Sequence, residues 1–193
     1  MGVTFDNVEQ RFVFDFEHDG AADIVSLTGE GYQVEAFGKC FYYGYEFTDQ
    51  TDSSLRAAFI RYVKFSPSLQ DKPDLTQFIQ KAINNLSHKI NLYDYNLVVM
   101  PQSTSRVNQY MVRYIYRFAQ PKLRKVEAVL NPDEELCATI RKQNVLVIDD
   151  IATSGSTLGE VLRALRILNE DNNITIFSLI GRKDLLAELA VPK

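Results

Sequence analysis

Residues 1–50 contain short stretches in which apolar and polar positions alternate. Such alternation predicts strands, because successive side chains of a strand point to opposite faces. In the clearest stretch, Arg11 to Phe16, every second residue is a phenylalanine. The other strands predicted in this part span 24–27, 32–37 and 41–47. A tight hairpin turn at Gly38 and Lys39 would join the last two.

The pattern then changes to helical spacing, and after residue 91 to an alternation of strands and helices. Apolar residues three or four positions apart predict amphipathic helices over 53–64 and 74–89. Further on we predict strands over 96–100, 125–130, 145–148 and 173–180, and helices over 106–119 and from about Leu158 onward. Alternating strands and helices are typical of an open parallel α/β sheet. We therefore predict an α/β core over 73–193, preceded by a β-rich and helical extension over 1–72.

Composition and charge narrow the class of protein. The chain has 193 residues, 46% hydrophobic and 24% charged, with a net charge of −4, as in ordinary globular proteins. The absence of a basic excess gives no reason to expect nucleic-acid binding. The two cysteines and two histidines are isolated from one another, so we expect neither zinc nor disulfides, and a reduced cytoplasmic setting. No apolar run has the length of a membrane span, so no membrane partner is expected.

The stretch Asn144 to Leu158, NVLVIDDIATSGSTL, carries the clearest chemistry. A short aliphatic run predicts a buried strand, and Asp149 and Asp150 follow at its carboxyl end. A loop rich in Ser, Thr and Gly then leads into a helix. Loop amides and the positive end of a helix dipole attract phosphate, while carboxylates accept hydrogen bonds from sugar hydroxyls or lie near a hard cation. The stretch therefore predicts a site for a phosphorylated sugar.

The same residues, VLVI-DD-IA-TSGST, resemble the phosphoribosyl-diphosphate (PRPP) binding motif of type I phosphoribosyltransferases. The resemblance implies the Rossmann-like open sheet of that family, a transferase that uses PRPP and Mg²⁺ in nucleotide metabolism, and a homodimer as one oligomeric state to test. It implies that Asp149 and Asp150 bind the ribose, stabilise positive charge on it in the transition state and hold Mg²⁺ indirectly. It implies a 5′-phosphate site made by Thr153, Ser154, Gly155, Ser156 and Thr157.

A second polar loop follows the first predicted core strand. In the family that this chain resembles, the loop in this place holds the pyrophosphate of PRPP. The corresponding residues here are Gln102, Ser103, Thr104, Ser105 and Arg106. A helix start and an arginine both favour an anion, although these serines would also serve as simple helix caps. Type I cores usually carry one more strand than the sequence of 73–193 supplies, so either a strand from the extension completes the sheet or the core is minimal.

The sequence identifies the donor substrate better than the acceptor. In the hypoxanthine-guanine and xanthine enzymes, the third residue after the acidic pair is an acid, whereas Thr153 stands there in this chain. The motif is in this respect closer to the orotate or ComF type. The resemblance implies transfer of phosphoribosyl to a nitrogenous base, with the aromatic strands of 1–72 as a candidate hood over that base. The alternative is a non-catalytic sensor of PRPP or a nucleotide, or a competence factor of the ComF type, on the same fold.

Overall fold

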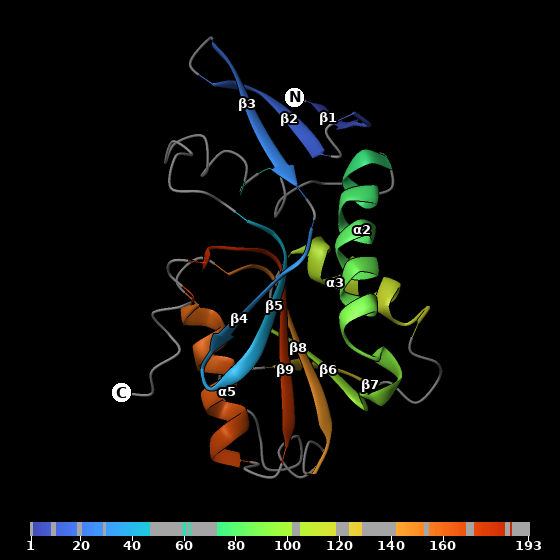
Figure 1. Ribbon diagram of the computed structural model, residues 1–193. Coiled ribbons are helices and arrows are strands. Elements are labelled where there is room, and N and C mark those ends of the chain that lie inside the picture. The colour runs from blue at the N-terminus through green and yellow to red at the C-terminus, as the bar shows by residue number, and fades with distance from the viewer. Residues whose placement is uncertain are drawn as a thin grey trace.

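The computed structural model (Figure 1) describes residues 2–8, 11–18, 21–28, 30–46, 60, 62, 73–101, 105–118, 124–128, 142–152, 155–168, 172–183 and 186. Its strands form two sheets. The smaller sheet is antiparallel and has the order β1 (Gly2–Asp6), β2 (Arg11–His18) and β3 (Ala21–Thr28). Its two outer strands both pair with β2 along their whole length.

The larger sheet has six strands in the order β4-β5-β9-β8-β6-β7. Their bounds are β4 (Tyr32–Ala36), β5 (Lys39–Glu46), β6 (Leu97–Pro101), β7 (Arg124–Ala128), β8 (Asn144–Ala152) and β9 (Asn173–Gly181). All neighbours are parallel except the edge strand β4, which is antiparallel to β5. The prediction of an open, mostly parallel α/β sheet is confirmed.

Helices cover both faces of this sheet. Helices α2 (Pro73–Lys89) and α3 (Arg106–Ile115) lie on one face, α5 (Ser156–Leu168) lies on the other, and the short 3₁₀ helix η1 (Leu92–Asp94) precedes β6. The buried side chains accordingly form two cores. We call one the α2–α3 core, which includes Phe78, Ile79, Met111, Ile115, Leu146 and Ile148. We call the other the α5 core, which includes Phe41, Val145, Val147, Leu158, Leu162 and Ile176.

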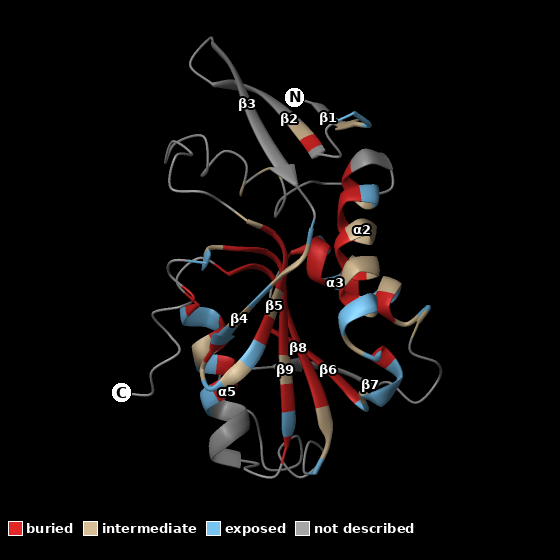
Figure 2. Cartoon of the chain, viewed as in Figure 1, coloured by how far each residue is buried: buried red, intermediate tan, exposed pale blue. Residues whose placement is uncertain are grey.

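Burial of the central strands on both faces explains their continuous aliphatic sequence. Strand β6 is buried at every position, and β8 at every position after Asn144 (Figure 2). Where the structure describes their side chains, helices α2, α3 and α5 are buried along one stripe each, as their helical spacing predicts. The strand and helix types predicted from 73 onward are thus confirmed wherever the structure describes them.

Strand β5 answers the question that the sequence left open. It comes from the N-terminal part of the chain, yet it pairs in parallel with β9, the last strand that the structure describes. A strand from the segment predicted as an extension therefore completes the sheet. The segment 1–72 is divided, since β4 and β5 belong to the large sheet whereas β1, β2 and β3 form a sheet of their own.

Several predicted boundaries differ from those in the structure. The turn between β4 and β5 is formed by Phe37 and Gly38, one residue earlier than predicted, and both have positive φ, which is the geometry of a type I′ hairpin. Strand β1 was not predicted from the sequence, and α3 ends at Ile115, earlier than the predicted 119. Of the helix predicted over 53–64, only Ile60 and Tyr62 lie within the described residues.

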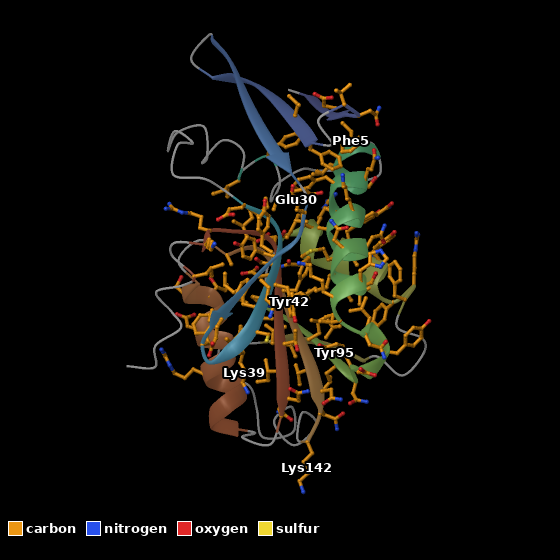
Figure 3. All side chains as sticks on the ribbon, viewed as in Figure 1. Phe5, Glu30, Lys39, Tyr42, Tyr95 and Lys142 are labelled. Carbon is orange, nitrogen blue, oxygen red and sulfur yellow. The ribbon has the colours of Figure 1, made fainter. Side chains whose placement is uncertain are left out.

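The small sheet contacts the rest of the molecule through buried aromatic rings. Phe12 is fully buried, with its ring edge-on to Tyr45 and to Phe78 at centroid distances of 6.0 and 5.2 Å. The Tyr45 hydroxyl donates to the Phe78 carbonyl oxygen (2.7 Å), and burial raises the pKa of that hydroxyl well above its ordinary 10.0. Lys81 lies over the ring of Phe5, labelled in Figure 3, at 4.3 Å. Aromatic packing thus joins the two sheets through α2.

Candidate functional site

The order of connections places a topological switch point between β6 and β8. The chain leaves β6 through α3 toward β7 on one side, and leaves β8 through α5 toward β9 on the other, with the two helices on opposite faces. In open α/β sheets, ligands bind at the carboxyl ends of the strands where the order reverses in this way. The pairing of β6 with β8 runs from Leu97 and Val145 to Val99 and Val147. The carboxyl edge just beyond that pairing is therefore the candidate site.

Both helices that flank this switch point begin at the carboxyl edge of the sheet. Gly155 directly precedes α5 with a φ of 68°, and its carbonyl oxygen accepts a hydrogen bond from the Gly159 amide at 2.7 Å. Ser156 and Thr157 in the first turn of α5 are exposed. No acidic residue lies in the first turn of α3 or of α5. The amides at these two helix starts can thus attract an anion, and neither first turn contributes a carboxylate of its own.

Two of the residues predicted for pyrophosphate lie at the start of α3. Ser105 precedes the helix and is buried, and its side chain does not cap α3. Arg106 is the first helical residue and is exposed. The structure thus brings Ser105 and Arg106 to the same edge as Gly155, Ser156 and Thr157. Residues 102–104 and 153–154, the other predicted members, lie outside the described residues.

Asp149 and Asp150, which we call the acid pair, are part of strand β8 rather than of the loop after it. They are 7% and 1% exposed. The Asp150 amide donates to Asp149 Oδ1 at 2.9 Å, and the Ile151 amide donates to Asp150 Oδ1 at 2.7 Å. Hydrogen bonds from backbone amides stabilise ionised carboxylates and fix their orientation. The acid pair is therefore held in place before any ligand arrives.

Strand β8 changes face at the acid pair. Residues four apart on a regular strand face the same side. Yet Val147 belongs to the α5 core and Ile151 to the α2–α3 core, while Ile148 belongs to the α2–α3 core and Ala152 to the α5 core. The backbone amides that follow each carboxylate bond to that carboxylate at this point. The acid pair therefore lies at a local rotation of the strand.

The neighbouring strands change face at the same row. In β9, Ile176 lies in the α5 core and Ile180 lies in the α2–α3 core. Ser178 lies between them and pairs with Asp149. Its hydroxyl donates to the Ile180 carbonyl oxygen at 2.9 Å. In β5, Phe41 and Tyr45 likewise lie in opposite cores. The residue of β5 that pairs with Ser178 lies between them. Three adjacent strands thus share one distorted row at the site.

Sequence reasoning missed Asn108 on α3. It is fully buried, and its Nδ2 donates to Asp149 Oδ1 at 3.5 Å. Its neighbours Val107, Met111 and Val112 are buried and apolar. A polar residue on the inner face of an otherwise apolar helix stripe was the signal that could have found it, because such burial is costly without a hydrogen-bond partner.

The acid pair supplies some, but not all, of the ligands that a hard cation needs. Carboxylate oxygens are the protein ligands that Mg²⁺ prefers, and Mg²⁺ is usually held by one or two carboxylates together with substrate phosphates. Within the described part of the chain, no group of three or more His, Cys, Asp or Glu residues comes together to hold a metal. The donor set therefore suits a cation that arrives with a phosphorylated ligand rather than one held by a complete protein cage.

Comparisons with known proteins return solved structures only, since no family model and no curated protein matches the sequence. One similar structure is a hypoxanthine-guanine-xanthine phosphoribosyltransferase, at 15% identity over 61% of this chain and 68% of that chain, with a TM-score of 0.42. The xanthine-guanine-hypoxanthine enzyme of Helicobacter pylori matches at 14% identity, over 57% and 74% of the two chains, with a TM-score of 0.40. A purine phosphoribosyltransferase from Pyrococcus horikoshii matches at 14% identity, over 54% and 82%, with a TM-score of 0.38. All three carry the name phosphoribosyltransferase.

No helix among the described residues combines the length and the apolar character needed to cross a membrane.

Proposed function

We propose that this protein is a phosphoribosyltransferase that binds PRPP with Mg²⁺ and transfers the phosphoribosyl group to a nitrogenous base, releasing pyrophosphate. The observation that carries the proposal is the position of the acid pair. Both carboxylates are buried and oriented by backbone amides, at the switch point between two helix N-termini that have no acid in their first turns. A sugar ring that carries hydroxyl groups and has an anionic group on each side fits that arrangement.

Each part of the donor substrate has a set of residues in this proposal. The 5′-phosphate binds at the start of α5, where Gly155 allows the backbone to turn its amides toward the anion. The pyrophosphate binds at the start of α3, with Arg106 as a cationic partner. The ribose hydroxyls donate hydrogen bonds to Asp149 and Asp150. The remaining predicted contacts, at 102–104 and 153–154, belong to the same two loops.

The chemistry follows from these positions. As the bond from ribose C1 to pyrophosphate breaks, positive charge develops on the ring, and the nearby carboxylates of the acid pair stabilise it. Mg²⁺, held by the acid pair indirectly and by the substrate, would neutralise charge on the leaving pyrophosphate. A nitrogen of the base donates the electron pair of the new bond to C1, and pyrophosphate leaves with the electrons of the old bond. Orientation by backbone amides means that the carboxylates need not reorganise during the reaction.

The first test compares Asp150→Asn with Glu160→Gln, a matched acid-to-amide change at an exposed position of α5. The new amide oxygen at position 150 can still accept from the Ile151 amide, so we expect the fold to be kept. Wild-type protein should show a rise in Tm with PRPP that requires Mg²⁺, because a ligand that binds only the folded state stabilises it. We expect Asp150→Asn to weaken this binding at least about tenfold and Glu160→Gln to leave it unchanged.

Turnover is then measured as pyrophosphate release across a panel of purine and pyrimidine bases. Release that depends on PRPP, Mg²⁺ and one base supports the transferase. Binding of PRPP without turnover on any base contradicts the transferase and supports a non-catalytic sensor. Absence of PRPP binding by the wild-type protein contradicts both functions.

A further inference from the structure

Asn108 is a buried amide with a specific place in the site. It lies in the first turn of α3, and its side chain reaches from that helix to β8, where Nδ2 donates to Asp149 Oδ1 at 3.5 Å. The same oxygen accepts the Asp150 amide at 2.9 Å. One carboxylate oxygen is therefore held from two directions, by the backbone of its own strand and by the helix that packs on it.

The cost of burying Asn108 indicates a role beyond packing. Its side chain is fully buried, and Oδ1 has no hydrogen-bond partner among the residues that the structure describes. Burying a polar group without full compensation is unfavourable, and an apolar residue of similar size would extend the stripe of Val107, Met111 and Ile115. The amide is thus unfavourable for packing at this position, and its identified contact is with the acid pair.

The position of Asn108 in the chain connects the two halves of the proposed ligand site. It follows Ser105 and Arg106, which lie at the start of α3, and it contacts the carboxylate proposed to bind ribose on β8. The pairing between β6 and β8 has already ended at this level of the sheet. A contact between α3 and β8 can therefore keep the two loops at a constant separation where backbone pairing does not.

We propose that Asn108 is a positioning residue for Asp149. It holds the carboxylate in the orientation that receives the sugar, because its amide supplies an uncharged N–H donor that reaches Asp149 Oδ1. This inference rests on the proposed function for the ligand that the oriented carboxylate serves. The contact itself exists in the protein without ligand.

The test uses an exchange of the two side chains. In Asn108→Asp, two carboxylates face each other in a buried contact, which is unfavourable. In the double variant Asn108→Asp with Asp149→Asn, the carboxylate lies on α3 and the amide on β8, so one donor and one acceptor face each other again. The matched control is Gln109→Glu, which makes the same chemical change at the next residue of α3, on its exposed side.

In the protein without ligand, we expect Asn108→Asp to lower Tm by about 2–8 °C and the double variant to regain at least half of that loss. Gln109→Glu should leave Tm unchanged. The Kd for PRPP with Mg²⁺ is then measured at a temperature at which every variant is folded. We expect Asn108→Asp to raise this Kd at least about tenfold and the double variant not to recover it, because the carboxylate is then on the wrong element.

Three outcomes decide the inference. A raised Kd in Asn108→Asp together with recovery of Tm in the double variant supports it, because a residue that only packs would show neither the loss of affinity nor the coupling to position 149. Two results overturn it: a Tm loss for Asn108→Asp no larger than that for Gln109→Glu, or a Tm loss for the double variant equal to the sum of the losses for Asn108→Asp and for Asp149→Asn measured alone. If wild-type protein does not bind PRPP, the proposed function fails, and the Tm measurements still decide whether Asn108 holds Asp149.

Discussion

Gly155 shows how a single backbone conformation supports the candidate site. Its φ of 68° lies in the left-handed region, which costs a residue with a side chain roughly 1–2 kcal/mol. The residue is buried directly before α5, where the chain must turn its amides toward the proposed phosphate. Gly38 in the β4–β5 turn has nearly the same φ, 66°, and a side-chain carbon added there would meet no atom within 4 Å. A residue with a side chain at position 38 would therefore have the same backbone strain, at a position away from the site.

We predict that Gly155→Ala and Gly38→Ala each lower the free energy of unfolding by roughly 1–2 kcal/mol, because alanine would have to adopt the left-handed backbone conformation at both positions. Only Gly155→Ala should also weaken PRPP binding, by roughly tenfold, the equivalent of one displaced hydrogen bond to a charged group. Chemical denaturation and calorimetric titration measure the two effects. Equal affinity of the two variants for PRPP would contradict the role of Gly155 in the phosphate site.

At the scale of elements, β5 and α2 pack closely against each other at Gly44. A side-chain carbon added at Gly44 of β5 would lie 2.5 Å from Ala82 Cβ and 3.0 Å from the Leu179 carbonyl oxygen. The glycine therefore lets α2 pack closely on β5 beside the row at which β5, β8 and β9 change face. Small residues on both elements are needed for this contact, because a side-chain carbon at position 44 would lie closer to Ala82 than van der Waals contact allows.

We predict that Gly44→Ala lowers the free energy of unfolding by about 1–3 kcal/mol through overpacking. Adding Ala82→Gly should restore part of the loss, although glycine inside α2 itself costs about 1 kcal/mol. Urea denaturation of the two single variants and the double variant measures the coupling. Strictly additive losses would show that the two residues do not share this contact.

At the scale of the whole molecule, the small sheet lies beyond the carboxyl ends of the large sheet, beside the N-terminal end of α2 (Figure 1). This is the side on which the acid pair and the starts of α3 and α5 are found. Lys142, labelled in Figure 3, marks the opposite edge, where β8 begins. That the N-terminal strands form a hood over the acceptor base stays a proposal, and Phe12 is the residue whose buried ring joins the small sheet to β5 and α2.

We predict that Phe12→Ala lowers the free energy of unfolding by about 3–5 kcal/mol, because it removes a fully buried ring. Val8→Ala, at a side chain that is 91% exposed, should change it by less than about 0.5 kcal/mol. Phe12→Leu keeps most of the volume and allows a functional test. We expect it to raise KM for the base while the Kd for PRPP stays within about twofold. A larger effect on PRPP than on the base would argue against a hood.

Local patterns in the sequence were enough to predict most of the strands and helices that the structure describes. The period of apolar residues follows from the geometry of each element, so it survives whatever the element packs against. The strand that carries Asp149 and Asp150 could be predicted for the same reason, although it continues to Ala152 and so contains the acid pair instead of ending before it. Element boundaries were less accurate: the hairpin turn began one residue early and α3 ended early, because turns depend on a few backbone angles that periodicity does not report.

By itself, then, the sequence determined the class of fold, the strand that carries the acid pair and the helix start that follows it. Only the tertiary structure decided that β5 completes the sheet, that three strands change face at one row, and that Asn108 contacts Asp149. These features join residues far apart in the chain, such as positions 108 and 149, and pairing in space leaves no periodic trace along the sequence. A buried amide on an apolar stripe is the one local sign, and its partner is visible only once the helix is packed on the sheet.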